Sequence, residues 1–458
     1  MTSDRYLDLD ITGVAHGGVF VARHEGRVVF VPDAIPGERV RARLTDAAPG
    51  DTRRFWRAEA LEVLDASPDR QRHVWRQADI DVAPEERPGG ADFGHIRLDA
   101  QRDLKTQVLR DALERIGRLQ VPVTMRPAFS EESGAGVVAH ESADGTGWRT
   151  RVSLHVDADG RIGPYAARSH RVVEVDGHPL ATSEVERIAR ELRDAKPGRI
   201  DLVQPSDGPV RVIERPERAP RDKRHGRQGG RVPRSTVPAT IPARRDPARE
   251  VIRQRVHDRQ FRLDAGGFWQ VHRLAAHTLS TLVASLLRQA RPEGPAIDPD
   301  AWHLDLYGGV GLFAATLGDL GGASTRVTSV ESDPRATEHA GENLAEWVGA
   351  RAETGRVDRW IARLGAEASV AERERLSRGV VVLDPPRTGA GRDVVEGVAS
   401  LWPDTVVYVA CDPVALARDL ATFREAGYET PAVHAVDLFP NSHHMEAVAV
   451  LSRAHADR

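Results

Sequence analysis

Cysteine is almost absent from this 458-residue chain, whose single thiol belongs to Cys411. One cysteine excludes an intrachain disulfide, and it excludes a zinc site or metal cluster built on several thiolates. A lone cysteine is either an inert core residue or a nucleophile. Its neighbours in the sequence must decide between these two roles.

Long apolar runs are also lacking. No stretch reaches the length of about 18 apolar residues that a membrane-spanning helix needs. The first residues, MTSDRYLDLDITG, have neither the basic start nor the apolar core of a secretory signal. We therefore expect a cytoplasmic protein without a membrane partner. The net charge of −4 implies that any binding of nucleic acid depends on local positive charge.

The length is sufficient for two or three domains, and the first expected domain covers residues 1–66. Short strand-like runs separated by turn residues occupy 17–23, 26–32, 38–44 and 56–64. Several short strands within about 60 residues predict a small β-barrel.

The second expected domain, residues 67–262, combines helical and strand patterns, so we expect an α+β unit. Apolar residues recur at helical spacing within 100–119, and strands are predicted within 148–166 and at 171–175. The basic stretch 211–259 has a local charge excess of +9. It is interpreted either as a solvated insertion without a role or as a segment that contacts phosphates.

From residue 302 the pattern alternates between apolar strands and helices, which predicts an α/β domain over 263–458. The expected strands are 302–307, 326–331, 379–384, 405–410, 434–439 and 446–451. Apolar strands separated by helices are typical of a parallel, doubly wound sheet. Ligands bind such sheets at the carboxyl ends of the strands.

Two motifs at predicted strand ends indicate an adenosine ligand. LDLYGGVGLF (304–313) leads a strand through glycines into a helix, which allows close approach of a ligand to the backbone. Glu331 ends the next strand, where a carboxylate can accept both hydroxyls of a ribose. Because the loop reads GGVG rather than GxGxxG, the pair favours an adenosine ligand other than NAD. A plain turn and an exposed glutamate are the alternative interpretation.

Three further motifs contain reactive side chains. Asp384 ends an apolar strand before two prolines, and Arg387 follows as a phosphate ligand or a structural residue. Cys411 lies between an apolar strand and a helix, whose dipole is expected to lower the thiol pKa, whereas Asp412 opposes this effect. Glu446 opens the last strand and is a candidate general base. His443 and His444 precede it, with spacing that is poor for one metal ion.

In this order, the motifs resemble the RNA uracil-5 methyltransferase family over nearly the whole chain. GVAHGGVFVAR (13–23) and VVFVPDAIPGERV (28–40) resemble a TRAM domain, which is an OB-like RNA-binding barrel. FWQVH (268–272) resembles the F-x-Q signature of the family. The remaining matches are LDLYGGVGLF, DPPRTG, ACDP with LARDL, and FPNSHHME.

The resemblance implies a Rossmann-like class I methyltransferase domain behind the TRAM barrel and the central domain. It implies S-adenosyl-L-methionine (SAM) as the donor and tRNA or rRNA as the partner. Independently of the resemblance, we expect a monomer. Cys411 would be the nucleophile and Glu446 the proton acceptor. The residues implied to bind SAM are Gln270, Tyr307, Glu331 and Asp384, and Asp358 is a possible further contact.

This chain departs from the family pattern at several positions. Many members bind an iron–sulfur cluster through four cysteines, but here Pro88, Ala91 and His178 occupy positions of those cysteines. No cluster and no other metal is therefore expected. Ala410 and Asp412 flank the nucleophile where better-known members have Ser and Asn. Leu312 also stands where some members place a polar cofactor contact.

The chemistry explains why a thiol is needed. Attack of a thiolate on C6 of uracil makes C5 nucleophilic, and a base must later remove the C5 proton. The target base must also leave its stack to enter a pocket. Two other functions stay open from the sequence: a SAM-dependent methyltransferase for another acceptor, and a catalytically silent RNA-binding or RNA-remodelling protein.

Overall fold

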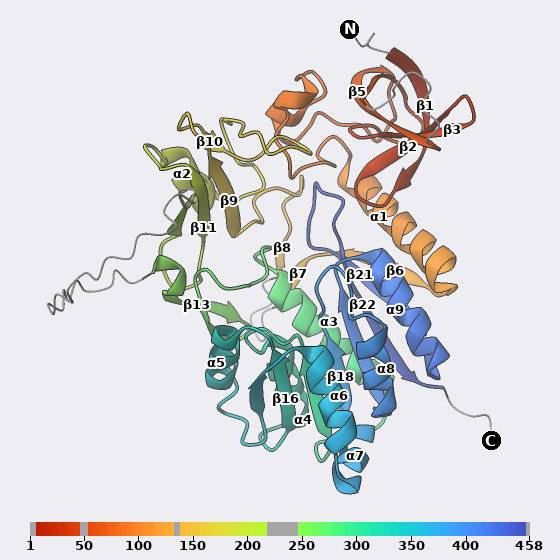
Figure 1. Cartoon of the computed structure of the whole chain (residues 1–458), viewed down its shortest axis with the longest axis vertical. Coiled ribbons are helices and arrows are strands. Elements are labelled where there is room, and N and C mark those ends of the chain that lie inside the picture. Colours follow the sequence, from red (N-terminus) through yellow and green to blue (C-terminus); the bar gives the residue numbers. More distant parts are fainter. Residues whose placement is uncertain (1–5, 46–53, 132–137, 218–245, 455–458) are drawn as a thin grey trace, which may run out of the picture.

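The computed structural model describes residues 6–45, 54–131, 138–217 and 246–454 (Figure 1). Its N-terminal part is a closed barrel with strand order β1-β2-β3-β5-β4. In β4, Val40 and Ala42 are buried while Arg39 and Arg41 are exposed, and this alternation gives the barrel an apolar interior. The predicted barrel is confirmed. Its strands are β1 (Tyr6–Ala15), β2 (Val19–His24), β3 (Arg27–Val31), β4 (Arg39–Leu44) and β5 (Phe55–Asp65).

The segment after the barrel connects it to the C-terminal sheet. Helix α1 (Leu98–Ala112) continues as a π-helical turn, η3 (Leu113–Gly117), which ends at left-handed Arg118. Strand β6 (Val123–Pro127) then pairs in parallel with β21 (Val433–Asp437). The C-terminal sheet therefore contains a strand from the stretch 67–262. Two short 3-10 helices precede α1, namely η1 (Arg76–Ala78) and η2 (Pro84–Glu86).

A separate four-stranded sheet has the order β10-β9-β11-β12. The strand predicted at 171–175 is wrong. Val173 N–H donates to Pro164 O, and only one isolated bridge joins Val172 to Tyr165. Backbone–backbone hydrogen bonds join residues 171–173 to the short segment 164–166, which is itself not a strand. The elements are β9 (Arg151–Val156), β10 (Ile162–Gly163), α2 (Ser183–Glu191), β11 (Gly198–Val203) and β12 (Arg211–Pro216).

Two hairpins complete this region: β7 (Phe129–Glu131) with β8 (Val138–His140), and β13 (Val251–Val256) with β14 (Arg259–Asp264). A 3-10 helix, η4 (Pro247–Arg249), precedes β13. Of the basic stretch 211–259, residues 218–245 lie outside the described residues.

The C-terminal part is a nine-stranded sheet with order β17-β16-β15-β18-β19-β22-β21-β6, and β20 also pairs with β22. The expected doubly wound sheet is confirmed, but it is not wholly parallel, because β22 runs antiparallel to β19 and β21. Its further strands are β15 (Trp302–Leu306), β16 (Arg326–Glu331), β17 (Arg351–Thr354), β18 (Val380–Leu383), β19 (Thr405–Ala410), β20 (Tyr428–Glu429) and β22 (Glu446–Arg453).

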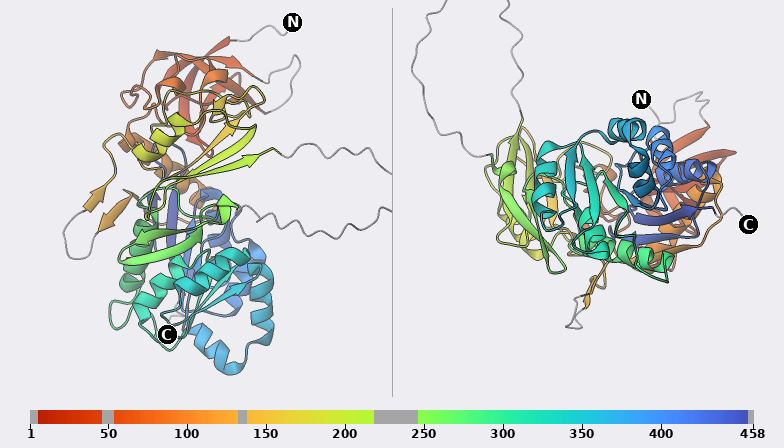
Figure 2. Two further views of the ribbon diagram at one scale, coloured as in Figure 1. Left: turned by 90° about the vertical axis from the view of Figure 1, so that its left-hand side faces the viewer. Right: turned by 90° about the horizontal axis from the view of Figure 1, so that it is seen from below.

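Helices cover both faces of this sheet. Alternate strand residues face two separate apolar clusters, with Val381 and Leu383 in one and Val380 and Val382 in the other. The helices are α3 (Ala275–Ala290), α4 (Leu312–Gly321), α5 (Pro334–Asn343), α6 (Val357–Glu367), α7 (Val370–Ser377), α8 (Arg392–Ser400) and α9 (Pro413–Glu425). The barrel and the sheet of β9–β12 lie at one end of the nine-stranded sheet (Figures 1 and 2). Within the described residues, no helix is long and apolar enough to cross a membrane.

Candidate active site

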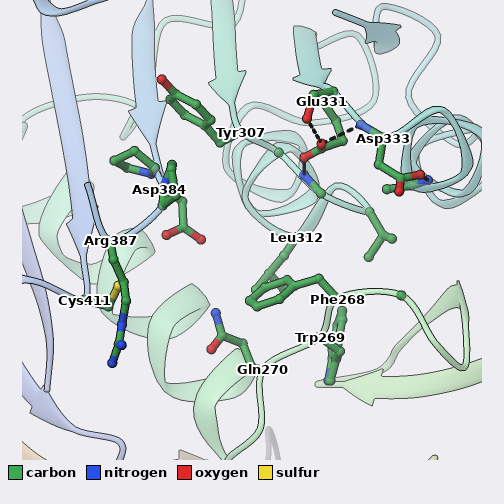
Figure 3. Close-up of a pocket in the computed structure, with 18 of the residues that line it drawn as sticks. Phe268, Trp269, Gln270, Tyr307, Leu312, Glu331, Asp333, Asp384, Arg387 and Cys411 are labelled. Carbon is green, nitrogen blue, oxygen red and sulfur yellow. Dashed lines mark hydrogen bonds between the residues drawn. The ribbon is translucent and has the colours of Figure 1, made fainter. Parts of the chain in front are cut away.

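The carboxyl ends of four neighbouring parallel strands open into one cavity of about 1340 Å³ (Figure 3). Strands β15, β16, β18 and β19 share their direction, so the residues that follow or end them lie at one edge of the sheet. The cavity is lined by all six residues predicted for the site: Gln270, Tyr307, Glu331, Asp384, Cys411 and Glu446.

The glycine loop fixes one side of this cavity. Gly309 and Gly311 have φ angles of 55° and 92°, which glycine adopts at little cost. A Cβ at Gly308 would lie 2.0 Å from Ser329 Oγ, so the loop also needs glycine for close packing. The Glu331 carboxylate accepts from Gly309 N–H at 3.2 Å and from Asp333 N–H at 2.8 Å. Glu331 is thereby held in a fixed orientation at the end of β16.

Asp305 was missed by the sequence analysis, although it lies inside the LDLYGG motif. It is completely buried in β15, and its Oδ2 accepts from Ala314 N–H at 3.0 Å and from Ser329 Oγ–H at 3.2 Å. Its Oδ1 has no partner among the described residues. Burial raises the pKa of Asp305 to about 7, and burial together with Asp305 raises the pKa of Asp384 to about 7. An acid inside an apolar strand was the available signal.

The register of β19 and β22 brings Cys411 and Glu446 to the same place. Ala410 pairs with Ala447, and because β22 is antiparallel, its first residue lies at the edge where β19 ends. Glu446 is 4% exposed, and its pKa is raised well above the usual range by burial and by Asp384. The nucleophile and the base predicted from the sequence therefore line the same part of the cavity.

The thiol pKa differs from the expectation based on the helix dipole. Burial, followed by the charges of Glu446 and Asp384, raises the pKa of Cys411 to about 12, and Arg387 opposes this shift. Cys411 precedes the N-cap residue Asp412, whose carboxylate accepts from the first N–H groups of α9 at 2.8 and 3.0 Å. Desolvation and neighbouring carboxylates therefore outweigh the helix dipole at this thiol.

The barrel contacts the loop that carries Cys411. His16, in the turn between β1 and β2, lies with Nε2 3.0 Å from Asp412 Oδ2. Behind this turn, His443 Nδ1 lies 2.5 Å from Asp92 Oδ2. A small cavity of about 100 Å³ lies between the turn and Cys411. No motif in the sequence had indicated that the barrel reaches this edge.

The two adjacent histidines face different partners. His444 lies 2.8 Å from Arg387 Nη2, and burial lowers its pKa to about 3. His444 therefore stays neutral near pH 7, whereas His443 pairs with the Asp92 carboxylate. Within the described residues, no group of three or more His, Cys, Asp or Glu could hold a metal ion.

The remaining predicted contacts come from a loop and a helix. Phe268 is 75% exposed at the cavity, beside buried Trp269 and half-buried Gln270 (Figure 3). Asp358 of α6 also lines the cavity, and its carboxylate pairs with Arg356 Nη2 at 2.7 Å. Leu312 opens α4 at the same wall, where it offers an apolar surface.

The positions that carry cluster cysteines in many family members are packed with apolar and aromatic side chains. Ala91 is buried in a small cluster with Trp75, Trp148 and Leu180. The ring of His178 lies 6.0 Å from that of Trp75. Packing of these side chains stabilises this region.

Comparisons with known proteins cover the whole chain. Residues 4–59 match the family model of the TRAM domain, and residues 370–454 match that of tRNA (Uracil-5-)-methyltransferase. A protein of Streptomyces avermitilis named as an uncharacterized RNA methyltransferase is 38% identical, with 98% of both chains covered. The 23S rRNA (uracil(1939)-C(5))-methyltransferase of Halomonas elongata is 30% identical, with 100% of this chain and 91% of the relative covered.

A solved structure has the same fold along nearly the entire chain. The Pyrococcus abyssi tRNA (uracil-54, C5)-methyltransferase, in complex with S-adenosyl-L-homocysteine, superposes with a TM-score of 0.62. It covers 97% of this chain and 100% of its own, at 20% identity. The barrel, the central sheet and the nine-stranded sheet thus have the architecture of a class I methyltransferase with an N-terminal TRAM domain.

Proposed function

The chain belongs to the SAM-dependent RNA (uracil-5-)-methyltransferase family, and from this premise we propose that it methylates C5 of a uridine through a covalent bond between Cys411 and C6. The observation that carries the proposal is the position of Cys411 and Glu446 at one sheet edge, inside the cavity that the cofactor residues also line. We propose rRNA as the substrate, since the Halomonas relative named for 23S rRNA is 30% identical, whereas the Pyrococcus relative named for tRNA is 20% identical.

The charges of the cavity suit the donor. Asp384 and Glu446 line the cavity and are acids with raised pKa values. Asp305 is buried next to Gly308 of the cavity wall, and its Oδ1 lacks a partner among the described residues. A ligand with a sulfonium and an ammonium group would be attracted by these carboxylates. We assign the ribose hydroxyls to Glu331, and further contacts with the donor to Gln270, Tyr307 and Asp384. When bound, SAM supplies an electrophilic methyl group.

The residues of this chain perform the remaining steps. Cys411 Sγ gives up its proton to water and bonds as the thiolate to C6 of the target base, which makes C5 nucleophilic. After C5 has gained the methyl group, the Glu446 carboxylate takes the C5 proton. The bond between Sγ and C6 then breaks, and the thiolate leaves with its electron pair. One thiol and one carboxylate are therefore sufficient for the covalent route.

The experiment traps this bond. The protein is mixed with SAM and with 5-fluorouridine-substituted fragments of 23S rRNA or tRNA, and a denaturation-stable adduct is sought by gel electrophoresis. Fluorine at C5 cannot leave as a proton, so the Sγ–C6 bond should persist. The adduct should form with the wild type and be absent from Cys411→Ala, and the RNA that gives it identifies the substrate class.

A matched control is Arg187→Gln. Arg187 is an exposed residue of α2, and it does not line the cavity. It should form the adduct as the wild type does. Adducts that persist in Cys411→Ala would refute the covalent role of this thiol. If SAM binds but no RNA gives an adduct, the methyl acceptor is a different group or the protein binds RNA without catalysis.

A further inference from the structure

A second cavity of about 510 Å³ adjoins the catalytic one. One of its walls is the sheet of β9–β12. The other face of this sheet is apolar, because Leu154, Ile200 and Leu202 pack there against Val185 of α2. The face that lines the cavity is therefore free to carry polar side chains.

That polar face is strongly basic. Ser153 pairs with Asp201, and Arg199 pairs with Arg215, so these side chains project from the same side of the antiparallel sheet. The Asp201 carboxylate accepts from Arg199 Nε at 2.6 Å, from Arg215 Nε at 2.7 Å and from Ser153 Oγ–H at 2.8 Å. This one acid already has two cationic partners.

Two more arginines line the cavity: Arg149, just before β9, and Arg151, the first residue of β9. Some of their N–H groups have no acceptor among the described residues. Arg151 Nη1 donates to Gly267 O at 2.5 Å, but its Nε and Nη2 are buried without a partner among the described residues. Arg149 Nε is likewise buried without a partner among the described residues. Burial lowers the pKa of Arg151 to about 10, so the side chain is still charged near pH 7. Buried charged donors without acceptors are costly, which favours an anionic ligand.

The two cavities share a wall that includes Arg149, Arg215 and the segment 266–269. A polymer whose target base occupies the catalytic cavity can therefore continue across this segment into the second one. Guanidinium groups bind phosphate oxygens through paired N–H donors. A volume of about 300–1,000 Å³ is typical of a ligand site, and this cavity falls within that range.

We propose that the second cavity binds phosphodiester groups of the RNA substrate beside the target nucleotide, with Arg149, Arg151, Arg199 and Arg215 as the ligands. This inference rests on the proposed function for the identity of the polymer. It assigns to the central sheet a role in holding the strand while the base is in the catalytic cavity.

The test measures binding separately from methyl transfer. Affinity of the full-length protein for a fluorescein-labelled oligouridine is determined at several salt concentrations, with an oligomer of neutral methylphosphonate backbone as the comparison probe. The variants are Arg151→Gln and Arg199→Gln, and the control is Arg187→Gln on the opposite side of the sheet. Arg199 is half-exposed, so its replacement keeps the experiment informative if Arg151→Gln does not fold.

Each cavity variant should bind oligouridine more weakly, and the slope of log affinity against log salt should fall by about 0.7 for each phosphate contact that is lost. SAM affinity, measured by calorimetry, should be unchanged, and Arg187→Gln should match the wild type. The inference is overturned by unchanged slopes in both cavity variants, by an equal effect of Arg187→Gln, or by a loss of SAM affinity, which would assign these arginines to the donor.

The two proposals can fail separately. If oligouridine binding depends on the cavity arginines but no uridine is methylated, the phosphate site stands and the proposed reaction does not. If methylation proceeds through Cys411 while the variants bind RNA with wild-type slopes, the reaction stands and the phosphate site does not.

Discussion

Ala410 of β19 pairs with Ala447 of β22, and this single pairing sets Cys411 beside Glu446 at the cavity edge of the sheet. The pairing works because β22 is antiparallel to β19, so the beginning of one strand meets the end of the other. A parallel β22 would place Glu446 at the opposite edge of the sheet.

Glu446→Gln should separate bond formation from release. Glutamine cannot accept the C5 proton, so Cys411 should remain bonded to methylated RNA even when the RNA contains ordinary uridine. Turnover should fall by about 10²–10⁴-fold, the usual contribution of a general base. A gel-shifted adduct that carries label from methyl-labelled SAM checks this. Normal turnover of the variant would remove Glu446 from the mechanism.

The reactivity of Cys411 should follow its raised pKa. Since the thiol pKa is about 12, alkylation by iodoacetamide should be slow at pH 7 and should rise about tenfold per pH unit up to pH 10 without a plateau. Above pH 7, where Asp384 is ionised, Asp384→Asn removes a negative charge and should speed alkylation. Arg387→Gln removes a positive charge and should slow it.

Mass spectrometry gives these alkylation rates without ambiguity, because the chain has only one cysteine. The protein unfolded in guanidinium is the control, and it should show the ordinary thiol pKa of about 8.5. A plateau below pH 8 in the folded protein would contradict the effect of burial and neighbouring carboxylates.

Asp305→Asn should alter the pH dependence of stability. The pKa of Asp305 is about 7 in the folded state, compared with about 3.9 in the unfolded state. As the pH rises, the unfolded state therefore loses this proton before the folded state does. The wild type therefore loses stability as pH rises from about 4 to about 7. Asparagine does not titrate, so the variant should not share this loss. The melting temperature of the variant minus that of the wild type should therefore increase between pH 5 and pH 8.

Asp159→Asn, in an exposed turn, is the control for this measurement and should follow the wild type at every pH. A constant difference between Asp305→Asn and the wild type across this range would mean that Asp305 does not titrate there.

Gly18→Ala should disturb the contact between the barrel and the catalytic edge. A Cβ at Gly18 would lie 2.4 Å from Asp92 Oδ2 and 2.7 Å from His443 Nδ1. Overpacking of this kind costs about 1–3 kcal/mol. The kcat/KM for RNA should fall, while SAM affinity stays near that of the wild type.

Gly17→Ala is the matched control, because Gly17 has a similar positive φ of 88° but no atom within 4 Å of an added Cβ. Both variants pay the same backbone penalty, and only Gly18→Ala adds the clash. Equal activities of the two variants would show that the position of the barrel turn does not affect catalysis.

Much of the fold could be read from local patterns. The alternation in VRARL predicted a barrel strand, and apolar runs followed by GGVG, DPP and ACDP predicted strand ends at a ligand site. These features depend on side-chain periodicity and turn chemistry, which neighbouring residues encode. The strand predicted at 171–175 is wrong because only Val172 forms a bridge there, and its partner Tyr165 lies outside the strands.

The sequence by itself determined which side chains are available for catalysis: one thiol, and carboxylates placed at strand ends. Only the tertiary structure decided how they are combined and charged. In the tertiary structure β22 runs antiparallel to β19, which brings Glu446 next to Cys411. His16 lies against Asp412, from which it is separated by 396 positions in the sequence. It also raised the pKa values of Cys411 and Asp305, because desolvation and Coulomb interactions depend on distances in space that no local pattern contains.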